Sequence, residues 1–355
     1  MLELLDVFHG EVTPHRALIY ARLPRPTGTG WRLQGEVRGP FSRSRRTLPA
    51  RVELVDCGPG PTLLAQAVLP DPCSWSPESP TWYDVSVVLT KDGAEQAETR
   101  RQFGIRRIGP HRNSLHLDGR RFVLRAVEPP PEWKTPRDVD DDRAARVRGG
   151  SNRNGFARTA DDTENKKNAE NASDWSNWSD WPDWSDWEAW RDAGRAMIAT
   201  APDDRLCEAA TQAGVMIVAR LDDLGQSAEW ELRRLARWPS VVAVLVDSPI
   251  VADAPLRRIA PNLLLVQPQV DFETADWSHA VVVDAEHLRH DTIREAAKRT
   301  GRPILARREL RGDTTWLAAL SQVDQLQADL APLGDFAGYF VSIGSGSSET
   351  AGDER

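Results

Sequence analysis

Short alternating runs of apolar and polar residues dominate the chain from residue 1 to about residue 108. Alternation with a period of two places apolar side chains on one face of a β-strand, and the segments between the runs are rich in proline and glycine. The runs are ALIYARL, WRLQGEV, ARVELVD, LLAQAVL and WYDVSVVL, at 17–23, 31–37, 50–56, 63–69 and 82–89. Regularly spaced short strands separated by turn signals predict an antiparallel β-sandwich.

After about residue 115 the pattern changes to continuous apolar runs of four to seven residues, most of them followed by a helical pattern. The runs lie within 122–127, 196–201, 215–221, 241–246, 263–270, 280–285, 303–310 and 336–342. Continuous runs are typical of strands buried on both faces of a parallel sheet. Eight such strands with helices between them predict a (β/α)₈ barrel. A doubly wound sheet is the alternative, but no glycine-rich phosphate loop follows any of the strands.

Two helices between these strands carry clear start and stop signals. Residues 202–214, PDDRLCEAATQAG, open with proline and acidic residues and close on Gly214, and residues 290–301, HDTIREAAKRTG, close on Gly301. Acidic residues in the first turn and glycine just past the last turn are the pattern expected at helix ends. These segments are therefore predicted to cover the outside of the barrel.

A long polar insertion separates the first two barrel strands, over about 135–190. Its first part contains almost no large apolar residues, so it cannot bury enough surface to balance the entropy lost on ordering and is expected to be disordered. The insertion ends in DWSNWSDWPDWSDWEAW, residues 174–190. A tryptophan stands at every third position of this run: Trp175, Trp178, Trp181, Trp184, Trp187 and Trp190.

A period of three matches neither the 3.6-residue period of an α-helix nor the two-residue period of a strand. The interspersed Asp and Ser residues favour turns, and Pro182 weakens any helix that crosses it. The run is therefore predicted to be the end of a loose segment on the functional face of the barrel. Three roles remain open: a strip that stacks on a sugar chain or a partner groove, a lid over the barrel mouth, or a low-complexity expansion. The last residues, 346–355, are expected to be a disordered tail.

Composition narrows the choice of partners and location. The 355 residues suit two domains, and a formal net charge of −8 argues against nucleic acid as a partner. No apolar run approaches the roughly 18 residues that a membrane-spanning helix needs. The first residues, MLELLDVFHGEV, lack the features of a signal peptide, so a cytoplasmic location is expected. Cys57, Cys73 and Cys207 are too few and too scattered for a disulfide framework or a zinc site, and no cofactor is expected.

Three motifs at the predicted domain junction resemble glycoside hydrolase family 2, which contains β-galactosidases, β-glucuronidases and β-mannosidases. CSWSPESPTWYDVSVVL (73–89) is similar to the family's Leu-Trp-Ser-Pro-Glu segment, and RQFGIRRI (101–108) is similar to its Phe-Gly-Phe-Arg strand. LHLDGRRFVLRAVE (115–128) resembles the entry into the first barrel strand. The resemblance implies an immunoglobulin-like sandwich over 1–108 and a barrel domain over 109–345, without the family's N-terminal jelly roll.

The same comparison finds none of the family's catalytic residues where they are expected. In WPSVVAVLVDSPI (238–250), Pro249 stands where the resemblance places the acid/base Glu. In RPILARRE (302–309), Arg308 stands at the position of the nucleophile, and Glu309 comes one residue later, which on a strand turns a side chain to the opposite face. Ala219 and Arg220 replace the family's Asp-Glu after the third strand. The resemblance therefore implies a barrel that has lost the hydrolytic chemistry of the family.

Other carboxylates remain near the predicted carboxyl ends of the barrel strands. They are Glu128, Asp222, Asp247, Asp284, Glu286 and Glu309. Strand ends and loops are commonly polar, and this is the simplest interpretation. The alternative is a displaced catalytic pair formed by Asp247 with Glu309 or Glu286, since retaining glycosidases need two carboxyl groups about 5 Å apart.

His287 and His290 lie near two of these acids but match no metal-ligand spacing, so no metal is predicted. Two functions therefore compete. The first is a catalytically degenerate family 2-like protein that binds a carbohydrate or a protein partner, with the six tryptophans as candidate binding residues. The second is an active glycosidase with displaced carboxylates.

Overall fold

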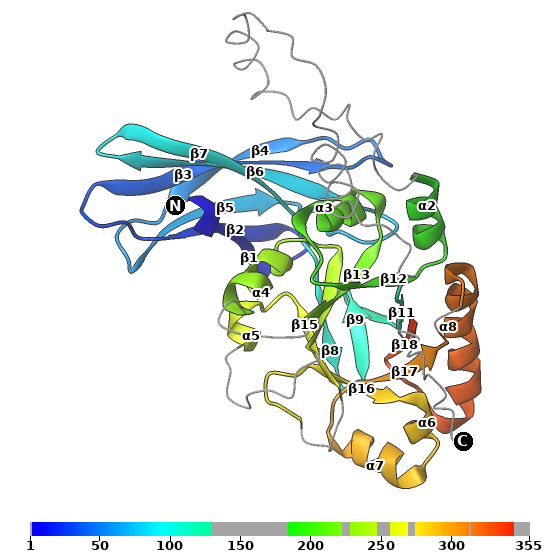
Figure 1. Ribbon diagram of the computed structural model, residues 1–355. Coiled ribbons are helices and arrows are strands. Elements are labelled where there is room, and N and C mark those ends of the chain that lie inside the picture. Colours follow the sequence, from blue (N-terminus) through cyan, green and yellow to red (C-terminus); the bar gives the residue numbers. More distant parts are fainter. Residues whose placement is uncertain are drawn as a thin grey trace, which may run out of the picture.

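The protein folds into an antiparallel sandwich, a small three-stranded sheet and a closed parallel barrel (Figure 1). The computed structural model describes residues 2–129, 184–221, 228–246, 256–268, 274–311 and 314–343. Within these ranges, every helix is too short or too polar to cross a lipid bilayer. The sandwich and barrel lie side by side, with helix α4 (Ala228–Ala236) next to strand β1 (Asp6–Val12) at the junction (Figure 1).

The sandwich consists of one curled antiparallel sheet with the strand order β1-β2-β5-β4-β3-β6-β7. The remaining strands are β2 (Arg16–Pro24), β3 (Trp31–Phe41), β4 (Ala50–Asp56), β5 (Thr62–Pro70), β6 (Trp82–Lys91) and β7 (Ala94–Phe103), and the 3-10 helix η1 (Leu2–Leu4) precedes β1. In β2, buried and less buried residues alternate without a break, as the sequence predicts. The predicted sandwich is confirmed, with the apolar faces of its strands forming one core.

The alternation of apolar residues predicts neither β1 nor β7, although the resemblance of residues 101–108 to a family strand covers the end of β7. Strand β7 has the polar sequence AEQAETRRQF because it lies at the sheet edge and exposes most of its side chains. Its signal was the turn: Asp92 and Gly93 both have positive φ between the paired residues Lys91 and Ala94. Asp-Gly at a two-residue connection is a strong hairpin signal.

The small sheet consists of β8 (Ile108–His111), β9 (Ser114–Leu117) and β10 (Arg120–Phe122) in the order β10-β9-β8. The side chain of Leu115 is buried in the same cluster as the side chains that fill the barrel interior. The sheet therefore closes the end of the barrel at which the strands begin.

Eight parallel strands form the closed barrel, and the last, β18, pairs with the first, β11. They are β11 (Leu124–Val127), β12 (Ala196–Thr200), β13 (Met216–Leu221), β14 (Val241–Val246), β15 (Leu264–Pro268), β16 (Ala280–Asp284), β17 (Ile304–Leu310) and β18 (Gly338–Ile343). Each strand coincides with one of the eight apolar runs. The predicted barrel is confirmed, and closure excludes the doubly wound sheet.

The helices of the barrel domain are mostly amphipathic and lie outside the strands. They are α2 (Trp184–Asp192), α3 (Asp204–Ala213), α4, α5 (Leu256–Ile259), α6 (Ala285–Leu288), α7 (Asp291–Arg299) and α8 (Trp316–Leu330), with the 3-10 helix η3 (Ala331–Leu333) after α8. In α3 the Asp203 carboxylate accepts a hydrogen bond from the Leu206 N–H at 2.8 Å, and Gly214 ends the helix with φ of 80°. Helices α3 and α7 lie where their start and stop signals predicted.

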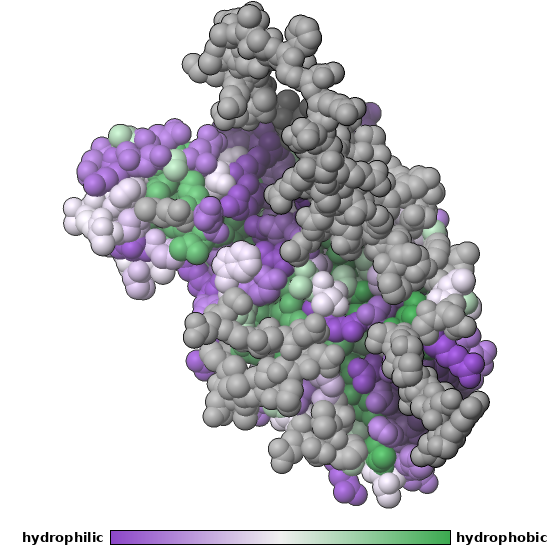
Figure 2. All heavy atoms as spheres, in the orientation of Figure 1, coloured by the Kyte–Doolittle hydropathy of each residue, from purple (hydrophilic) through white to green (hydrophobic). Residues whose placement is uncertain are grey.

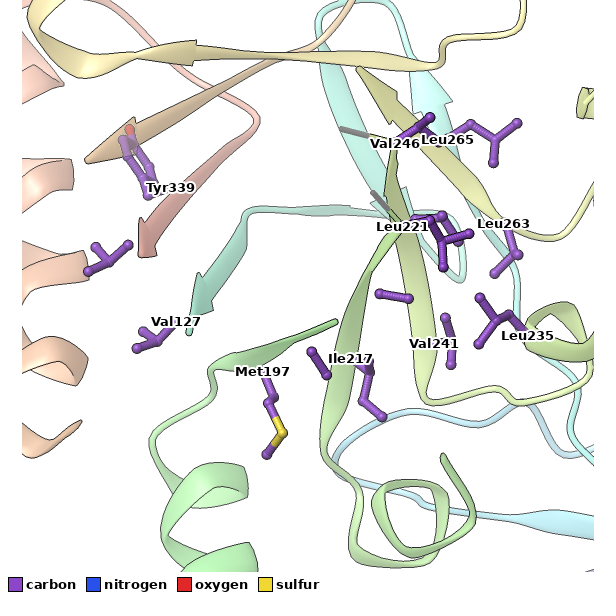
Figure 3. Packing of buried hydrophobic residues seen from close by; sticks show 14 of the residues in the cluster. Val127, Met197, Ile217, Leu221, Leu235, Val241, Val246, Leu263, Leu265 and Tyr339 are labelled. Atoms are coloured by element: carbon purple, nitrogen blue, oxygen red, sulfur yellow. The ribbon is translucent and has the colours of Figure 1, made fainter. Parts of the chain in front are cut away.

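The barrel strands bury both faces, which explains their continuous apolar sequences. One set of side chains fills the interior, and the alternate set packs against the helices. Figure 3 shows Val127, Met197 and Ile217 on the side of their strands that faces the helices. Gly338 is required in β18 because a Cβ there would lie 2.4 Å from the Leu124 carbonyl oxygen. This alternation also decides which residues at the strand ends point into the barrel mouth.

Helix α2 corrects the last part of the prediction for residues 135–190, in which the tryptophan run is a loose segment. Residues 184–190 lie in this helix, and the indoles of Trp187 and Trp190 are only 1% and 2% exposed. Residues three apart on a helix share one face, so two tryptophans of the run are buried together against the barrel core.

The other predictions for this insertion, and the prediction of a C-terminal tail, concern residues that the structure does not describe. Trp175, Trp178 and Trp181, the side chain of Trp184, and the tail over 346–355 lie outside the described residues.

The junction motifs hold the sandwich and barrel together. The indole N–H of Trp75 donates to the Thr211 carbonyl at 2.9 Å. The buried Arg106 guanidinium donates to the carbonyls of Trp238, Pro239 and Asn262 at 3.1, 2.6 and 2.5 Å. Gly104 lies so close to Pro239 that a Cβ would approach its ring to 2.1 Å. The motif residues Trp75, Gly104 and Arg106 are therefore interdomain contacts.

Candidate active site

A cluster of charged residues lies at the carboxyl ends of the barrel strands, which is the face where barrel enzymes carry their active sites. On β17, Leu305 belongs to the barrel interior, whereas Ile304 and Ala306 pack against the helices. Because side chains alternate along a strand, Arg307 and Glu309 share the inward face with Leu305. The described members of this mouth cluster are Glu128, Arg220, Asp284, Arg307 and Glu309.

Glu128 and Arg220 form an ion pair across the mouth, with the guanidinium donating from Nη2 to Oε1. Glu128 follows β11, and its backbone N–H donates to the Val341 carbonyl at 2.9 Å, which fixes its position. Burial raises the pKa of the Glu128 carboxyl, while Arg220 opposes this shift and the charge of Glu309 adds to it. Glu128 and Glu309 therefore lie close enough to interact electrostatically.

A second ion pair lies on the other side of the mouth. Asp284 at the end of β16 is the register partner of Arg307 on β17, and their side chains join at 2.9 Å. Each of these two mouth carboxylates thus has a guanidinium partner. Among the described residues, no ion pair involves Glu309, which is exposed.

Arg308, at the position that the resemblance gives to the nucleophile, faces away from the mouth. Its guanidinium donates to Asp329 of helix α8 at 2.6 Å, and Leu310, two residues later, packs against the helix-facing core. Glu309, one residue late for the family pattern, is thus the residue on the inward face. The resemblance assigns position 308 to the nucleophile. The alternation of side chains along β17 shows instead that Glu309 points into the mouth.

The other candidates are dispersed or lie outside the described residues. Glu286 lies on α6, where its exposed carboxylate is 3.7 Å from Arg289 in an ion pair. Asp222, Asp247 and Pro249 are outside the described residues. Within the part of the chain that the structure describes, no three His, Cys, Asp or Glu side chains are arranged to hold a metal ion.

The sequence shows Arg220 in place of an acidic residue of the family, but it does not predict that Arg220 pairs with Glu128. The two residues are 92 positions apart, and no local pattern joins them. Arg307 was not singled out at all. The available signal was the strand period, which places it two residues after the interior Leu305.

The fold and mouth define a (β/α)₈-barrel protein with a β-sandwich ahead of the barrel. Within this class the chain resembles family 2: residues 42–106 match the model of "Glycosyl hydrolases family 2". The matched segment contains Trp75, Gly104 and Arg106, the residues that join the two domains. No curated protein sequence is similar enough to count as a relative.

Solved structures of this family share the fold. A β-glucuronidase of Bifidobacterium dentium, in complex with coumarin-3-O-glucuronide, has a TM-score of 0.56 and 12% identity over 95% of this chain and 59% of its own. A family 2 member from Bacteroides cellulosilyticus has a TM-score of 0.58 and 13% identity over 97% and 44%. A Bacteroides uniformis β-glucuronidase has a TM-score of 0.54 and 11% identity over 95% and 45%. The chain therefore spans between 44% and 59% of the lengths of these three proteins.

Proposed function

We propose that this chain is a catalytically degenerate, family 2-like protein that binds a carbohydrate or a protein partner without hydrolysing glycosidic bonds. The observation that carries the proposal is Arg220, which stands where the resemblance expects an acidic pair and binds Glu128 inside the mouth. A retaining glycosidase needs one carboxyl group that donates a proton and one free carboxylate that attacks the sugar. An arginine paired to Glu128 opposes the first role, because its charge favours the ionised carboxylate.

A carbohydrate is the first partner to test, because the similar Bifidobacterium dentium enzyme is described with a bound glucuronide. The tryptophans available for stacking are reduced to Trp175, Trp178, Trp181 and Trp184. Trp187 and Trp190 are withdrawn as binding residues, because a buried indole cannot stack on a ligand.

The alternative is an active glycosidase with displaced carboxylates, and one observation favours it. Glu309 faces the mouth near Glu128, whose raised pKa suits a general acid. In this alternative Glu309 is the nucleophile, with Glu128 or Asp247 as its partner. Glu286 is not proposed as a partner, because it forms its ion pair with Arg289 on the exposed face of α6.

Turnover of chromogenic glycosides separates the two functions. We expect the wild-type protein to release no chromophore above background from galactosides, glucuronides or mannosides, because loss of both catalytic groups lowers the rate by many orders of magnitude. A β-glucuronidase assayed in parallel is the positive control. Turnover that disappears in Glu309→Gln and persists in Glu295→Gln, an exposed carboxylate on α7, contradicts the proposal and supports the alternative.

A further inference from the structure

A charged groove of about 310 Å³ lies between the sandwich and the outside of the barrel, and it shares no residue with the barrel mouth. The sandwich contributes the start of the chain and β7, and the barrel domain contributes α4 and the first turn of α3. Hydrophilic residues gather where α4 meets the sandwich (Figure 2). The volume is at the lower end of the range for small-molecule sites, so it suits one small ligand rather than an extended chain.

Four guanidinium groups line this groove, those of Arg101, Arg233, Arg234 and Arg237. Arg233 pairs with Asp6 at 2.9 Å and with Glu229 at 2.6 Å. Arg234 pairs with Asp204 at 2.9 Å and with Glu231 at 2.7 Å, and Arg237 pairs with Asp204. Asp6 and Asp204 are each shared by two arginines, since Arg22 also pairs with Asp6. The lining itself has four guanidinium groups and three carboxylates, those of Glu3, Asp6 and Asp204. Arg233 and Arg234 also pair with Glu229 and Glu231, which do not line the groove, so Arg101 is the lining arginine that no carboxylate of the described residues pairs with.

Arg101 is the member of this set that has no carboxylate partner within 4 Å among the described residues. Its guanidinium donates instead to Thr99 Oγ1 at 2.8 Å and to the carbonyls of Arg100 and Leu2 at 3.2 and 3.3 Å. Burial and the nearby positive charge of Arg237 lower the pKa of Arg101, while the negative charges of Asp204 and Glu3 partly oppose this shift. An added anion beside Arg101 and Arg237 relieves this repulsion and accepts charge-assisted hydrogen bonds.

An exposed apolar surface lies beside these charges. Trp230 and Leu4 both line the groove, with 52% and 54% of their surfaces exposed. The Arg234 guanidinium lies 5.8 Å from the centre of the Trp230 ring, which holds a cation near the indole. An indole that remains half exposed offers a flat apolar face to a ring-shaped ligand.

The groove also contains hydrogen-bond acceptors that a simple anion cannot use. Glu3, Asp6 and Asp204 contribute carboxylates to the lining. Such carboxylates repel a bare phosphate or carboxylate ion but accept hydrogen bonds from hydroxyl groups. A ligand that carries an anion, several hydroxyls and an apolar ring face matches all three parts of the lining.

We propose that this groove binds an anionic monosaccharide, either a sugar acid or a sugar phosphate. Its anionic group lies on Arg101 and Arg237, its ring against Trp230, and its hydroxyls on Glu3 and Asp6. The proposal goes beyond the proposed function, because the site is outside the barrel mouth and requires neither loss nor retention of hydrolysis.

Isothermal titration of the full chain tests the groove with glucuronate, glucose 6-phosphate, glucose and inorganic phosphate as probes. At least one of the two anionic sugars binds, and binds more tightly than glucose or phosphate. Arg101→Gln weakens that binding roughly tenfold or more, since it removes a charge-assisted contact. Trp230→Ala weakens it roughly three- to tenfold, as expected for loss of a stacking surface.

Two matched substitutions serve as controls. Trp31→Ala removes another indole with a cation over its ring, at 5.4 Å from Lys91, and Arg38→Gln removes an exposed arginine of β3. Both leave the affinity unchanged. If Arg101→Gln does not fold, the affinity of Trp230→Ala decides the test, because Trp230 is exposed and its replacement does not disturb the core. Arg101→Lys then retains most of the wild-type affinity, because it keeps the positive charge.

Several results overturn the proposal. The first is that neither anionic sugar binds, and the second is that glucose binds as tightly as the anionic sugars. The third is that phosphate binds as tightly as they do with an affinity that Trp230→Ala does not change. The fourth is that Trp31→Ala weakens binding as much as Trp230→Ala does. Failure of the proposed function looks different. If the chain hydrolyses glycosides, Glu309→Gln abolishes turnover and leaves the groove affinity unchanged, whereas Arg101→Gln lowers the groove affinity and leaves turnover unchanged.

Discussion

His9 shows how a single side chain in the core responds to its surroundings. It is buried on β1, its ring meets that of Phe103 edge-on at 6.0 Å, and the Gly10 carbonyl is 3.3 Å from Nδ1. Burial lowers the pKa of His9 from 6.5 to about 4, and the nearby positive charge of Arg106 contributes in the same direction. The imidazole is therefore neutral in the folded protein at neutral pH, although it becomes protonated below pH 6.5 when the chain is unfolded.

This difference predicts a pH dependence of stability. Because the folded-state pKa lies below the unfolded one, the contribution of His9 is complete above pH 6.5 and is lost as the pH falls toward 4. The loss is about 3 kcal/mol for a shift of this size. Urea unfolding across this window measures it in the wild type and in His9→Leu. Between pH 6.5 and 4, the free energy of unfolding falls less steeply with pH in the variant than in the wild type, while acidic groups elsewhere affect both proteins equally. Identical pH dependences of the two proteins contradict the prediction.

At the scale of elements, helix α2 shows that part of a repetitive tryptophan sequence can belong to the hydrophobic core. Its Trp187 and Trp190 belong to a run of period three, yet they are only 60° apart around an ideal helix, according to its 3.6-residue turn. Their indoles pack into the core between α2, α3 and the barrel. Position in the run therefore does not decide the role of a tryptophan; burial against a neighbouring element does.

Alanine at either buried position creates a cavity in this core. Trp187→Ala and Trp190→Ala are each expected to reduce the free energy of unfolding by about 3–5 kcal/mol. Trp230→Ala, which removes an indole that is 52% exposed, is the control and costs less than about 1 kcal/mol. Thermal and urea unfolding of the three variants provide the comparison. Equal stabilities of all three proteins rule out the buried position of α2.

At the scale of the whole molecule, one buried arginine joins the two domains. Arg106 lies after the last strand of the sandwich, and its three carbonyl acceptors belong to the segments before β14 and β15. Its burial lowers the pKa of the guanidinium to about 9, which still leaves it charged at neutral pH. A planar group with several donors can satisfy three acceptors at once, which an ammonium on a flexible chain does less well.

Arg106→Met removes the guanidinium donor from these three barrel carbonyls, of which that of Trp238 keeps a hydrogen bond from the Val241 N–H at 3.1 Å. We expect a loss of about 3 kcal/mol or more, with unfolding that separates into a sandwich and a barrel transition. Differential scanning calorimetry detects both changes. The neighbouring Arg107→Met is the control, since the Arg107 side chain forms an exposed ion pair with Asp118 at 3.6 Å, within the sandwich-to-barrel connection. A single transition at the wild-type temperature shows that Arg106 does not couple the domains.

The sequence by itself determined where the barrel strands lie and which motifs join the sandwich to the barrel. Burial on both faces requires continuous apolar runs, so each of the eight runs became a strand, and alternation likewise marked the inner strands of the sandwich. Strand β7 escaped this reasoning because an edge strand needs few apolar residues. The sequence also shows that Arg220 and Arg308 stand where the family has acidic residues, because that comparison needs only the motifs and no contacts.

Only the tertiary structure decided which side chains meet. Arg220 reaches Glu128, Arg308 turns to Asp329, and Arg101 approaches Arg237 because distant elements pack together. Periodicity is set by the local geometry of the backbone, and a sequence displays it directly. Pairing between side chains depends on the packing of elements that lie far apart in the sequence, and such packing leaves no local pattern in it.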